Sequence, residues 1–331
     1  MVIDGTLPAS IAAAVQELRA GELVGLPTET VYGLAADATS DAAVARVYAA
    51  KGRPADHPLI VHVADAAGIA YFAQGVPAFA QRLVAAFWPG PLTLIVPRKV
   101  GVAGAAAGGQ DSIGLRCPAH PVAQALLRAC AEATPPMHGL AAPSANQFGR
   151  VSPTTATHVQ GEFSDSLLVL DGGPCQVGIE STIVDCTRGA PVLLRPGAIT
   201  RAQIEAACGE RLRSKDELAA PDPRASGTLA AHYAPAAKVR LMDAPTLQAA
   251  LDVLGEDAAD IAVYARTPLR SRSTRIVQRR MPDDAQAVAQ QLFAVLRSFD
   301  AQRVKLIWIE TPPATPDWEG VRDRLLRAAA A

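Results

Sequence analysis

The sequence lacks both of the glycine-rich motifs that commonly bind nucleotide phosphates. Neither G-x-x-x-x-G-K-[ST] nor G-x-G-x-x-G occurs in its 331 residues, so a P-loop and a dinucleotide-binding turn are both excluded. Any phosphate must therefore be held by basic side chains and hydroxyl groups on loops. Open α/β sheets place such loops at the ends of their strands, and the search for a site begins there.

An excess of charge of either sign is also missing. Only 19% of the residues are charged and the formal net charge is −1, so no overall field attracts nucleic acid or an anionic membrane. One local concentration of positive charge stands apart, with no acidic residue among its members: Arg266, Arg270, Arg272, Arg275, Arg279 and Arg280. This cluster indicates either a surface that contacts RNA or a solvated strand with its loops.

Long apolar runs and paired cysteines are absent as well. No stretch approaches the roughly 18 apolar residues that a membrane span needs, and residues 1–22 lack the basic start and apolar core of a signal peptide. The five cysteines are scattered without a C-x-x-C pair, which argues against a zinc or redox centre. We therefore expect a soluble protein in the reducing cytoplasm.

Helix-like and strand-like segments alternate along the chain, which predicts an α/β fold. The first alternation covers residues 1–212, with helices expected to be capped at Ser10 and Ser152 and a mobile Gly/Ala loop at 101–109. Residues 213–237 are rich in proline and read as a linker. A second alternation over 238–331 predicts a smaller Rossmann-like unit.

The segment KGRPADHPLIVH, residues 51–62, is the strongest candidate for a phosphate site. Lys51, Arg53 and His57 lie within seven residues on a loop that Pro54 stiffens, and three cations at this spacing suit an oligophosphate. The alternative is a helix C-terminus that basic residues stabilise. His62 follows in an apolar strand, where an imidazole is either paired in the core or faces a pocket.

Other strand ends carry polar side chains, although each could be an ordinary turn. Arg116 follows a strand and could bind a carboxylate, and two threonines flank a glutamate in PTETVYGL, residues 27–34. Further candidates occur in AAPSAN, GIESTIVD and LLRPG. The accumulation favours a site for a nucleotide and a small anionic or zwitterionic molecule. No Ser-His-Asp or Cys-His pair indicates covalent catalysis.

Taken in order, eight sequence blocks resemble the Sua5/YrdC/YciO family of threonylcarbamoyl-AMP synthases. They are PTETVYGL, KGRPADHPLIVH, FWPGPLTLIV, LRCPAHP, AAPSAN, GIESTIVD, LLRPG and SGTLAAHYAP. The resemblance covers about residues 10–237, and the following unit looks like the C-terminal domain of the Sua5 type. It implies a YrdC-like twisted mixed sheet at 1–212, a linker or lid carrying HYAP at 213–237, and a Rossmann-like domain at 238–331.

The resemblance also implies the reaction and the residues that perform it. ATP, L-threonine and bicarbonate would give threonylcarbamoyl-AMP and pyrophosphate, with Mg²⁺ as the usual metal and Lys51 and Arg53 as the catalytic cations. Threonine would be bound by Thr30, His62, Arg116, Ala142 and Ser181. ATP would be bound by Lys51, Arg53, His57, Ser112, Ser144, Asn146, Ser152 and Arg195, with Tyr233 as part of a lid. No residue is assigned as a metal ligand.

The chemistry implied is addition of the threonine amine to bicarbonate or CO₂, followed by attack of the new carboxylate on the α-phosphate. The product would pass to a separate transferase that modifies adenosine 37 of tRNA, and direct contact with tRNA is a further expectation. His57 departs from the family pattern, which often has Asn there. Two alternatives remain open: a YrdC-like RNA-binding or ribosome-assembly protein without synthase activity, and a carbamoyl-transfer domain like that of hydrogenase-maturation proteins.

Overall fold

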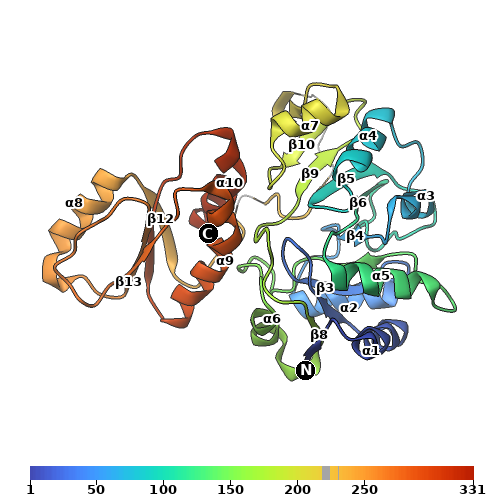
Figure 1. The fold of residues 1–331 in the computed structure, drawn as a ribbon, viewed down its shortest axis with the longest axis horizontal. Helices are drawn as coiled ribbons and strands as arrows, with labels where there is room; N and C mark the ends of the chain where they lie inside the picture. The colour runs from blue at the N-terminus through green and yellow to red at the C-terminus, as the bar shows by residue number, and fades with distance from the viewer. Residues whose placement is uncertain (218–223, 230) are drawn as a thin grey trace. The chain divides into compact units, whose positions relative to one another are not determined.

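The structure is a computed structural model that describes residues 1–217, 224–229 and 231–331. The chain forms two compact units, one of 1–148 with 152–228 and one of 149–151 with 229–331 (Figure 1). The division after Thr228 falls inside the segment 213–237 that the sequence suggests as a linker. Pro221 and Pro223, on which that expectation partly depends, lie outside the described residues. No helix in the described ranges is long and apolar enough to cross a membrane.

The first unit is built on a mixed sheet of eleven strands in the order β1-β8-β2-β3-β7-β4-β6-β5-β9-β10-β11. The strands are β1 (Val2–Asp4), β2 (Val24–Leu26), β3 (Gly33–Asp37), β4 (Ile60–His62), β5 (Leu92–Pro97), β6 (Ser112–Arg116), β7 (Leu140–Ala141), β8 (Leu168–Asp171), β9 (Thr182–Asp185), β10 (Val192–Arg195) and β11 (Arg213–Ser214). β4 and β6 run parallel, whereas β5 is antiparallel to β6. The predicted α/β class with a mixed sheet is confirmed.

Among the described residues of this unit, seven α-helices accompany the sheet. They are α1 (Pro8–Arg19), α2 (Asp41–Lys51), α3 (Ile69–Phe72), α4 (Ala78–Phe87), α5 (Pro121–Glu132), α6 (Ala156–Phe163) and α7 (Arg201–Cys208). The start and end of α2 follow directly from the sequence. The Ser40 side chain accepts a hydrogen bond from the Ala43 amide, and Gly52 ends the helix in the left-handed conformation with φ of 60°.

The helices cover the two faces of the sheet unequally. Apolar residues of α2, α3, α4, α6 and α7 pack against one face, from β8 and β3 to β10. On the opposite face, α1 and α5 cover only the end that contains β2, β3, β7 and β8. The remaining part of that face carries a small apolar cluster made of strand residues and Ala225. The sheet is therefore three-layered at one end and open on one face at the other.

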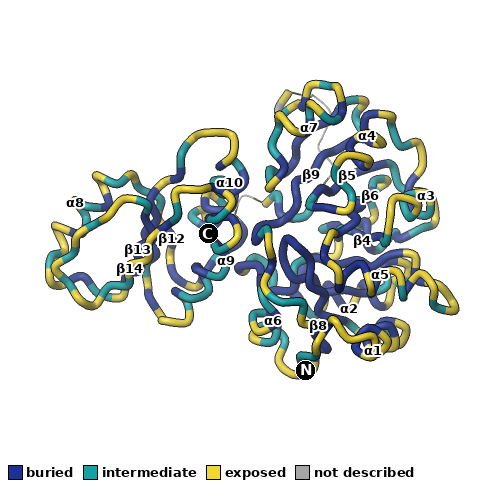
Figure 2. The backbone as a smooth tube through the Cα atoms, viewed as in Figure 1, coloured by how far each residue is buried: buried dark blue, intermediate teal, exposed yellow. Residues whose placement is uncertain are grey.

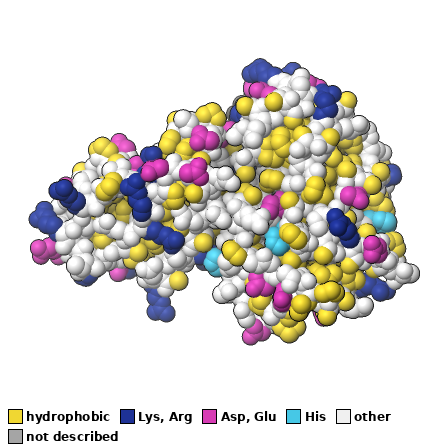
Figure 3. Space-filling view, in the orientation of Figure 1, with side chains coloured by type: hydrophobic (Ala, Val, Ile, Leu, Met, Phe, Trp, Pro, Cys, Tyr) yellow, Lys and Arg dark blue, Asp and Glu magenta, His cyan; other side chains and the backbone are white. Residues whose placement is uncertain are grey.

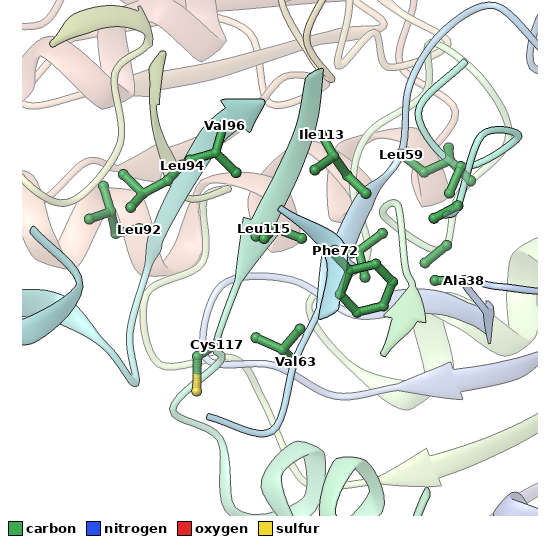
Figure 4. Close-up of a cluster of buried hydrophobic side chains, with 14 of the residues drawn as sticks. Ala38, Leu59, Val63, Phe72, Leu92, Leu94, Val96, Ile113, Leu115 and Cys117 are labelled. Atoms are coloured by element: carbon green, nitrogen blue, oxygen red, sulfur yellow. The ribbon is translucent and has the colours of Figure 1, made fainter. Parts of the chain in front are cut away.

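The large core lies on the helix-covered face. Leu92, Leu94 and Val96 of β5 and Ile113 and Leu115 of β6 point into it (Figure 4). Alternate residues of each strand point the same way because successive side chains of a strand face opposite sides. Figure 2 shows how completely these central strands are buried. The intervening residues of β5 and β6 must therefore face the open side of the sheet.

Three local expectations from the sequence are wrong. α1 begins at Pro8 after Leu7, and Ser10 lies inside it, because proline is favoured in the first turn of a helix. Ser152 caps no helix, since α6 begins at Ala156 with Thr155 as its cap. The loop 101–109 contributes the buried Ala103, Ala106 and Ala107, so its small side chains pack as part of the structure.

The second unit has a four-stranded parallel sheet in the order β12-β15-β13-β14. Its elements are β12 (Lys238–Met242), α8 (Ala244–Leu254), β13 (Ile261–Ala265), β14 (Val277–Arg280), α9 (Ala285–Ala301), β15 (Leu306–Glu310) and α10 (Glu319–Ala329). Leu247 and Leu251 of α8 pack on one face of this sheet. The helices α9 and α10 pack together on the other, so the Rossmann-like expectation is confirmed.

Candidate active site

The open face of the first unit is lined by the residues that alternate with the core residues. Ser112, Gly114 and Arg116 occupy every second position of β6, while Ile113 and Leu115 between them are buried in the core. The same alternation puts Thr93 of β5 and His62 of β4 on the open side. The strand pattern thus separates residues that hold the fold from residues available to a ligand.

A pocket lies on this face. It is lined by Pro58, Leu59, Ile60, Thr93, Ile95, Gln110, Ser112, Gly114, Ile183, Arg224, Ala225 and Ser226. Its cavity measures about 10 Å³, which is room for roughly one water molecule. At Gly114, an added Cβ would be 3.6 Å from both Ile60 Cγ1 and Thr93 Cγ2. The floor of the pocket is therefore open at Gly114 because that residue has no side chain.

Residues 224–226 cover this pocket and are tied down at both sides. Arg224 forms an exposed ion pair of 2.6 Å with Asp56, and its amide donates to Gln110 Oε1 at 2.8 Å. Ser226 accepts a hydrogen bond from Arg195 Nη1 at 2.8 Å through its carbonyl. Ala225 packs against the small apolar cluster. We call residues 224–226 the covering segment, and its position explains the small volume of the pocket.

Lys51, the last residue of α2, is buried beside the pocket-forming loop. Its Nζ donates to the carbonyl oxygen of Ser144 at 2.5 Å and to that of Asn146. Burial lowers the pKa of Lys51 to about 7, with a further lowering from the nearby Arg53 guanidinium and an opposing effect from Glu162. A lysine with this pKa changes charge near neutral pH and responds strongly to a nearby anion.

Arg53 and His57 shape the loop between α2 and β4. Arg53 Nη2 donates to the carbonyl oxygen of Pro58 at 3.0 Å, and its Nε donates to that of His57 at 3.3 Å. Its guanidinium carbon lies 5.6 Å from the centre of the Phe148 ring. Burial and then the charge of Arg53 lower the pKa of His57. The loop therefore presents one fixed cation, Arg53, and one imidazole that favours its neutral form.

Arg116 is buried in a set of polar contacts at the end of β6. Its Nη2 lies 2.6 Å from Glu29 Oε1, and both side chains are 5% exposed. Its Nη1 donates to Thr30 Oγ1 at 2.8 Å, and its Nε donates to the carbonyl oxygen of Gly90 at 3.3 Å. The PTETVYGL block and the LRCPAHP block thus meet through an ion pair that the sequence does not reveal.

His62 ends β4 directly beside Arg116, its partner in the parallel register of β4 and β6. The residue is 3% exposed. Burial and then the charge of Arg116 lower the pKa of His62 to about 3, so the ring is neutral at physiological pH. Within the described ranges its Nδ1 has no hydrogen-bond partner. A buried nitrogen of this kind is costly unless a ligand or water completes it.

Ser181 and Arg195 meet at the start of β9 and the end of β10. Arg195 Nη2 donates to the carbonyl oxygen of Ser181 at 2.9 Å and to its Oγ at 3.2 Å. The same Oγ lies 2.7 Å from Thr93 Oγ1. Nearby in sequence, Glu180 accepts a hydrogen bond of 2.5 Å from Ser152 Oγ. These contacts connect the GIESTIVD and LLRPG blocks to the pocket through Thr93.

The structure brings most of the predicted site residues of the first unit into contact in pairs. Lys51 contacts Ser144 and Asn146, Thr30 contacts Arg116, and Ser181 contacts Arg195. Ser112 lines the pocket. Ala142 extends β7, and its amide donates to the carbonyl oxygen of Ile60 at 3.0 Å.

Tyr233 belongs to the second unit and is fully buried there. Its backbone is left-handed, with φ of 61°. The ring lies 5.4 Å from the centre of the Phe293 ring, and the Arg324 guanidinium carbon lies 5.4 Å from the centre of the Tyr233 ring.

Three residues of the site were not identified from the sequence: Thr93, Gly114 and Glu180. The period-two pattern could have placed Thr93 and Gly114 on the face opposite the core. The position of Glu29 between two threonines was noted, but its pairing with Arg116 depends on a contact between distant segments.

The donors gathered here suit an anion better than a metal ion. Among the described residues, no three His, Cys, Asp or Glu side chains gather as metal ligands would. The buried carboxylate of Glu29 is paired with Arg116, and that of Glu180 accepts from Ser152. The buried cations Lys51, Arg53, Arg116 and Arg195 are suited to phosphate and carboxylate groups.

Two family models match the chain. The model for Sua5, YciO and YrdC proteins, which carries the description "Telomere recombination", matches residues 16–197. The model described as "Threonylcarbamoyl-AMP synthase, C-terminal domain" matches residues 199–330. Together the two matches account for nearly the whole sequence.

Curated relatives and solved structures agree with these matches. The threonylcarbamoyl-AMP synthase of Bacillus subtilis is 37% identical over 96% of this chain and 92% of its own length. That of Pyrococcus abyssi is 36% identical over 91% and 88%. The crystal structure of P. abyssi Sua5 complexed with L-threonine superposes with a TM-score of 0.86 at 35% identity, covering 96% of this chain and 94% of that one.

Proposed function

The chain belongs to the Sua5/YciO/YrdC family, and from this premise we propose that it is a threonylcarbamoyl-AMP synthase for tRNA modification. It converts ATP, L-threonine and bicarbonate into threonylcarbamoyl-AMP and pyrophosphate. The observation that carries the proposal is that the first unit buries two kinds of polar group. Lys51 and Arg53 form a cationic side, and Arg116, Thr30 and His62 form a side suited to an amino acid.

We assign the threonine side to Thr30, His62, Arg116, Ala142 and Ser181. P. abyssi Sua5 was solved with L-threonine bound, which supports a threonine site in this relative of it. The Arg116 guanidinium suits the carboxylate of the amino acid. The neutral His62 ring, with its Nδ1 lacking a partner among the described residues, is suited to a hydroxyl or an amine.

We assign the ATP side to residues around the loop that follows α2 and the pocket beside it. They are Lys51, Arg53, His57, Ser112, Ser144, Asn146, Ser152 and Arg195, with Tyr233 contributed by the HYAP block. The covering segment lies over the pocket that Ser112 lines, and we propose that it moves when ATP binds. Arg53 and Arg195 contact Ser226, and this movement would free both cations for phosphate.

The reaction follows from these positions in two steps. The threonine amine attacks the carbon of CO₂ and loses a proton, or attacks the carbon of bicarbonate with breakage of a C–O bond and release of water; either route gives an N-carboxylate. A carboxylate oxygen then attacks the α-phosphorus of ATP, and the bond to the β-phosphate oxygen breaks to release pyrophosphate. Lys51 and Arg53 neutralise charge that builds on the phosphates. Mg²⁺ carried by ATP would supply further charge neutralisation, and no residue of this chain is assigned to hold it.

The proposal is tested with purified protein, ATP, L-threonine, bicarbonate and Mg²⁺, following pyrophosphate. Threonine-dependent release is expected, and its absence would remove the synthase assignment. Arg53→Ala should lower turnover by about tenfold or more, because it removes a cation that stabilises the transition state. An exposed arginine of the first unit, Arg128→Ala, provides the matched control and should leave turnover unchanged.

We place the enzyme in the cytoplasm, where its five buried cysteines are unpaired thiols, and its product is consumed by a tRNA threonylcarbamoyl transferase. The arginines of residues 270–280 support direct tRNA contact, since Arg270, Arg272, Arg275, Arg279 and Arg280 are all exposed. Figure 3 shows Lys and Arg side chains at several places on one face of the molecule. Glutamate at positions 270, 272 and 279 together should weaken tRNA binding and flatten its salt dependence. Unchanged tRNA affinity would reject this surface while leaving the synthase assignment intact.

A further inference from the structure

The buried ion pair of Glu29 and Arg116 matches the two charges of an amino acid. Arg116 presents a fixed positive charge to a carboxylate, and Glu29, 2.6 Å from it, presents a fixed negative charge. Both side chains are 5% exposed, so water screens neither charge well and a ligand beside them feels both. A molecule with one charge only would meet a repulsive partner next to the attractive one.

Both members of the pair have hydrogen-bonding capacity left for a ligand. A guanidinium has five N–H donors, and the hydrogen bonds of Arg116 to Gly90 and Thr30 use one donor each on Nε and Nη1. Its Nη2 faces Glu29 in the ion pair but makes no hydrogen bond among the described residues. A carboxylate has about four acceptor positions. Glu29 uses Oε1 for Arg116 and Oε2 for the Ala119 amide at 3.1 Å. Neither side chain has to release its partner to bind a ligand.

An independent observation places a missing polar ligand at this point. His62 is the register partner of Arg116 on the adjacent strand and is 3% exposed. Among the described residues nothing bonds to its Nδ1. A nitrogen that is buried without a partner indicates that a polar group from outside the chain completes it. The ion pair and the incomplete imidazole therefore lie side by side.

We propose that Glu29 is a further substrate-binding residue, which takes the ammonium group of L-threonine while Arg116 takes its carboxylate. The ion pair thereby selects a zwitterion over a simple hydroxy acid or amino alcohol. This inference depends on the proposed threonine site and adds to it the residue that recognises the amine. Glu29 also fixes the orientation of Arg116, because it holds one end of the guanidinium while Thr30 holds the other.

Two analogues of threonine separate the roles of the two charges. 3-Hydroxybutyrate is threonine without its amino group, and 1-aminopropan-2-ol is threonine without its carboxylate. Glu29→Gln should weaken threonine binding by about tenfold or more, because a charge-assisted hydrogen bond is lost. The same change should leave 3-hydroxybutyrate binding unchanged or stronger, because Arg116 is no longer neutralised. The dissociation constant of 3-hydroxybutyrate divided by that of threonine should therefore be about tenfold lower in Glu29→Gln than in the wild type. Calorimetry measures both constants.

Glu310→Gln supplies a matched control in the second unit. Glu310 is also 5% exposed and is paired with an arginine, at 2.9 Å from Arg266 Nη2. This variant should leave the affinities for threonine and both analogues unchanged. ATP affinity should be unchanged in Glu29→Gln as well, which shows that the fold of the site is intact.

The mirror variant keeps the test decisive if Glu29→Gln does not fold. Arg116→Gln should weaken the binding of threonine about tenfold or more. It should leave the binding of 1-aminopropan-2-ol unchanged, since Glu29 remains to bind the ammonium group. The inference would be overturned if Glu29→Gln weakened the binding of threonine and 3-hydroxybutyrate equally, or if Arg116→Gln weakened the binding of threonine and 1-aminopropan-2-ol equally. Glu29 would then only support its loop, and the synthase assignment would stand. Failure of the wild-type protein to bind threonine would overturn both.

Discussion

The titration of Lys51 gives a quantitative prediction about ATP binding. In the free protein burial and Arg53 hold the pKa of Lys51 at about 7, against the weaker opposing effect of Glu162. Phosphate groups placed beside this lysine favour its charged form and raise its pKa. ATP binding should therefore draw a proton onto the protein, and at pH 7 the uptake should be about half a proton per site.

The sign of the pH dependence follows from the same shift. Below pH 7 most Lys51 side chains are already charged, whereas above pH 7 each must gain a proton before it can bind phosphate. The apparent affinity for ATP should fall about tenfold between pH 6 and pH 8. Calorimetry in two buffers with different ionisation enthalpies measures both the affinity and the protons taken up.

Two variants isolate the contribution of Lys51 from the titration of ATP itself. Lys51→Arg keeps a charge that does not titrate in this range, so its proton uptake should be smaller by about half a proton at pH 7. Lys51→Met removes the charge at every pH and should bind weakly with the same flattened dependence. If wild type and Lys51→Arg show equal proton uptake and equal pH slopes, Lys51 does not contact the phosphates in the way proposed.

Two further predictions concern the open face of the sheet. Gly114→Ala should raise the KM for ATP with little change in melting temperature, because a Cβ at Gly114 would lie 3.6 Å from Ile60 Cγ1 and Thr93 Cγ2 without a clash but would fill the pocket floor. Steady-state kinetics and thermal melting of the variant check this. His62 has a pKa of about 3 when folded and about 6.5 when unfolded, so acid favours the unfolded state. Each pH unit below 6.5 should lower the free energy of unfolding of the wild type by about 1.4 kcal/mol, and His62→Gln should not show this loss. Urea unfolding at pH 6.5 and pH 4.5 measures the difference.

The class of fold and the general position of the site could be predicted from local patterns. Alternating helical and extended segments identified both α/β units, and Ser40 and Gly52 show how short signals delimit a helix such as α2. The strand-end positions of Arg116 and Arg195 placed basic groups at one sheet, because strand ends in α/β proteins converge on ligands.

Pairing between distant segments could not be predicted in this way. The order of eleven strands depends on packing that no local window contains. The contact of Glu29 with Arg116 joins positions 87 residues apart, and the covering segment reaches Arg53 and Arg195 from the region expected to be a linker. Ser152 was expected to cap a helix, but its hydroxyl instead bonds to the buried Glu180, a tertiary contact that outweighs a local preference.

The alternation of β6 between two faces has a consequence for genetics. If every residue of Ser112–Arg116 were varied in cells that depend on this protein, changes at Ile113 and Leu115 should lower the amount of protein that accumulates, since both point into the core. Changes at Ser112 and Gly114, which are only partly buried, should instead leave abundance closer to normal and reduce growth through lost activity. Within five consecutive codons, the cause of a growth defect should switch from one residue to the next.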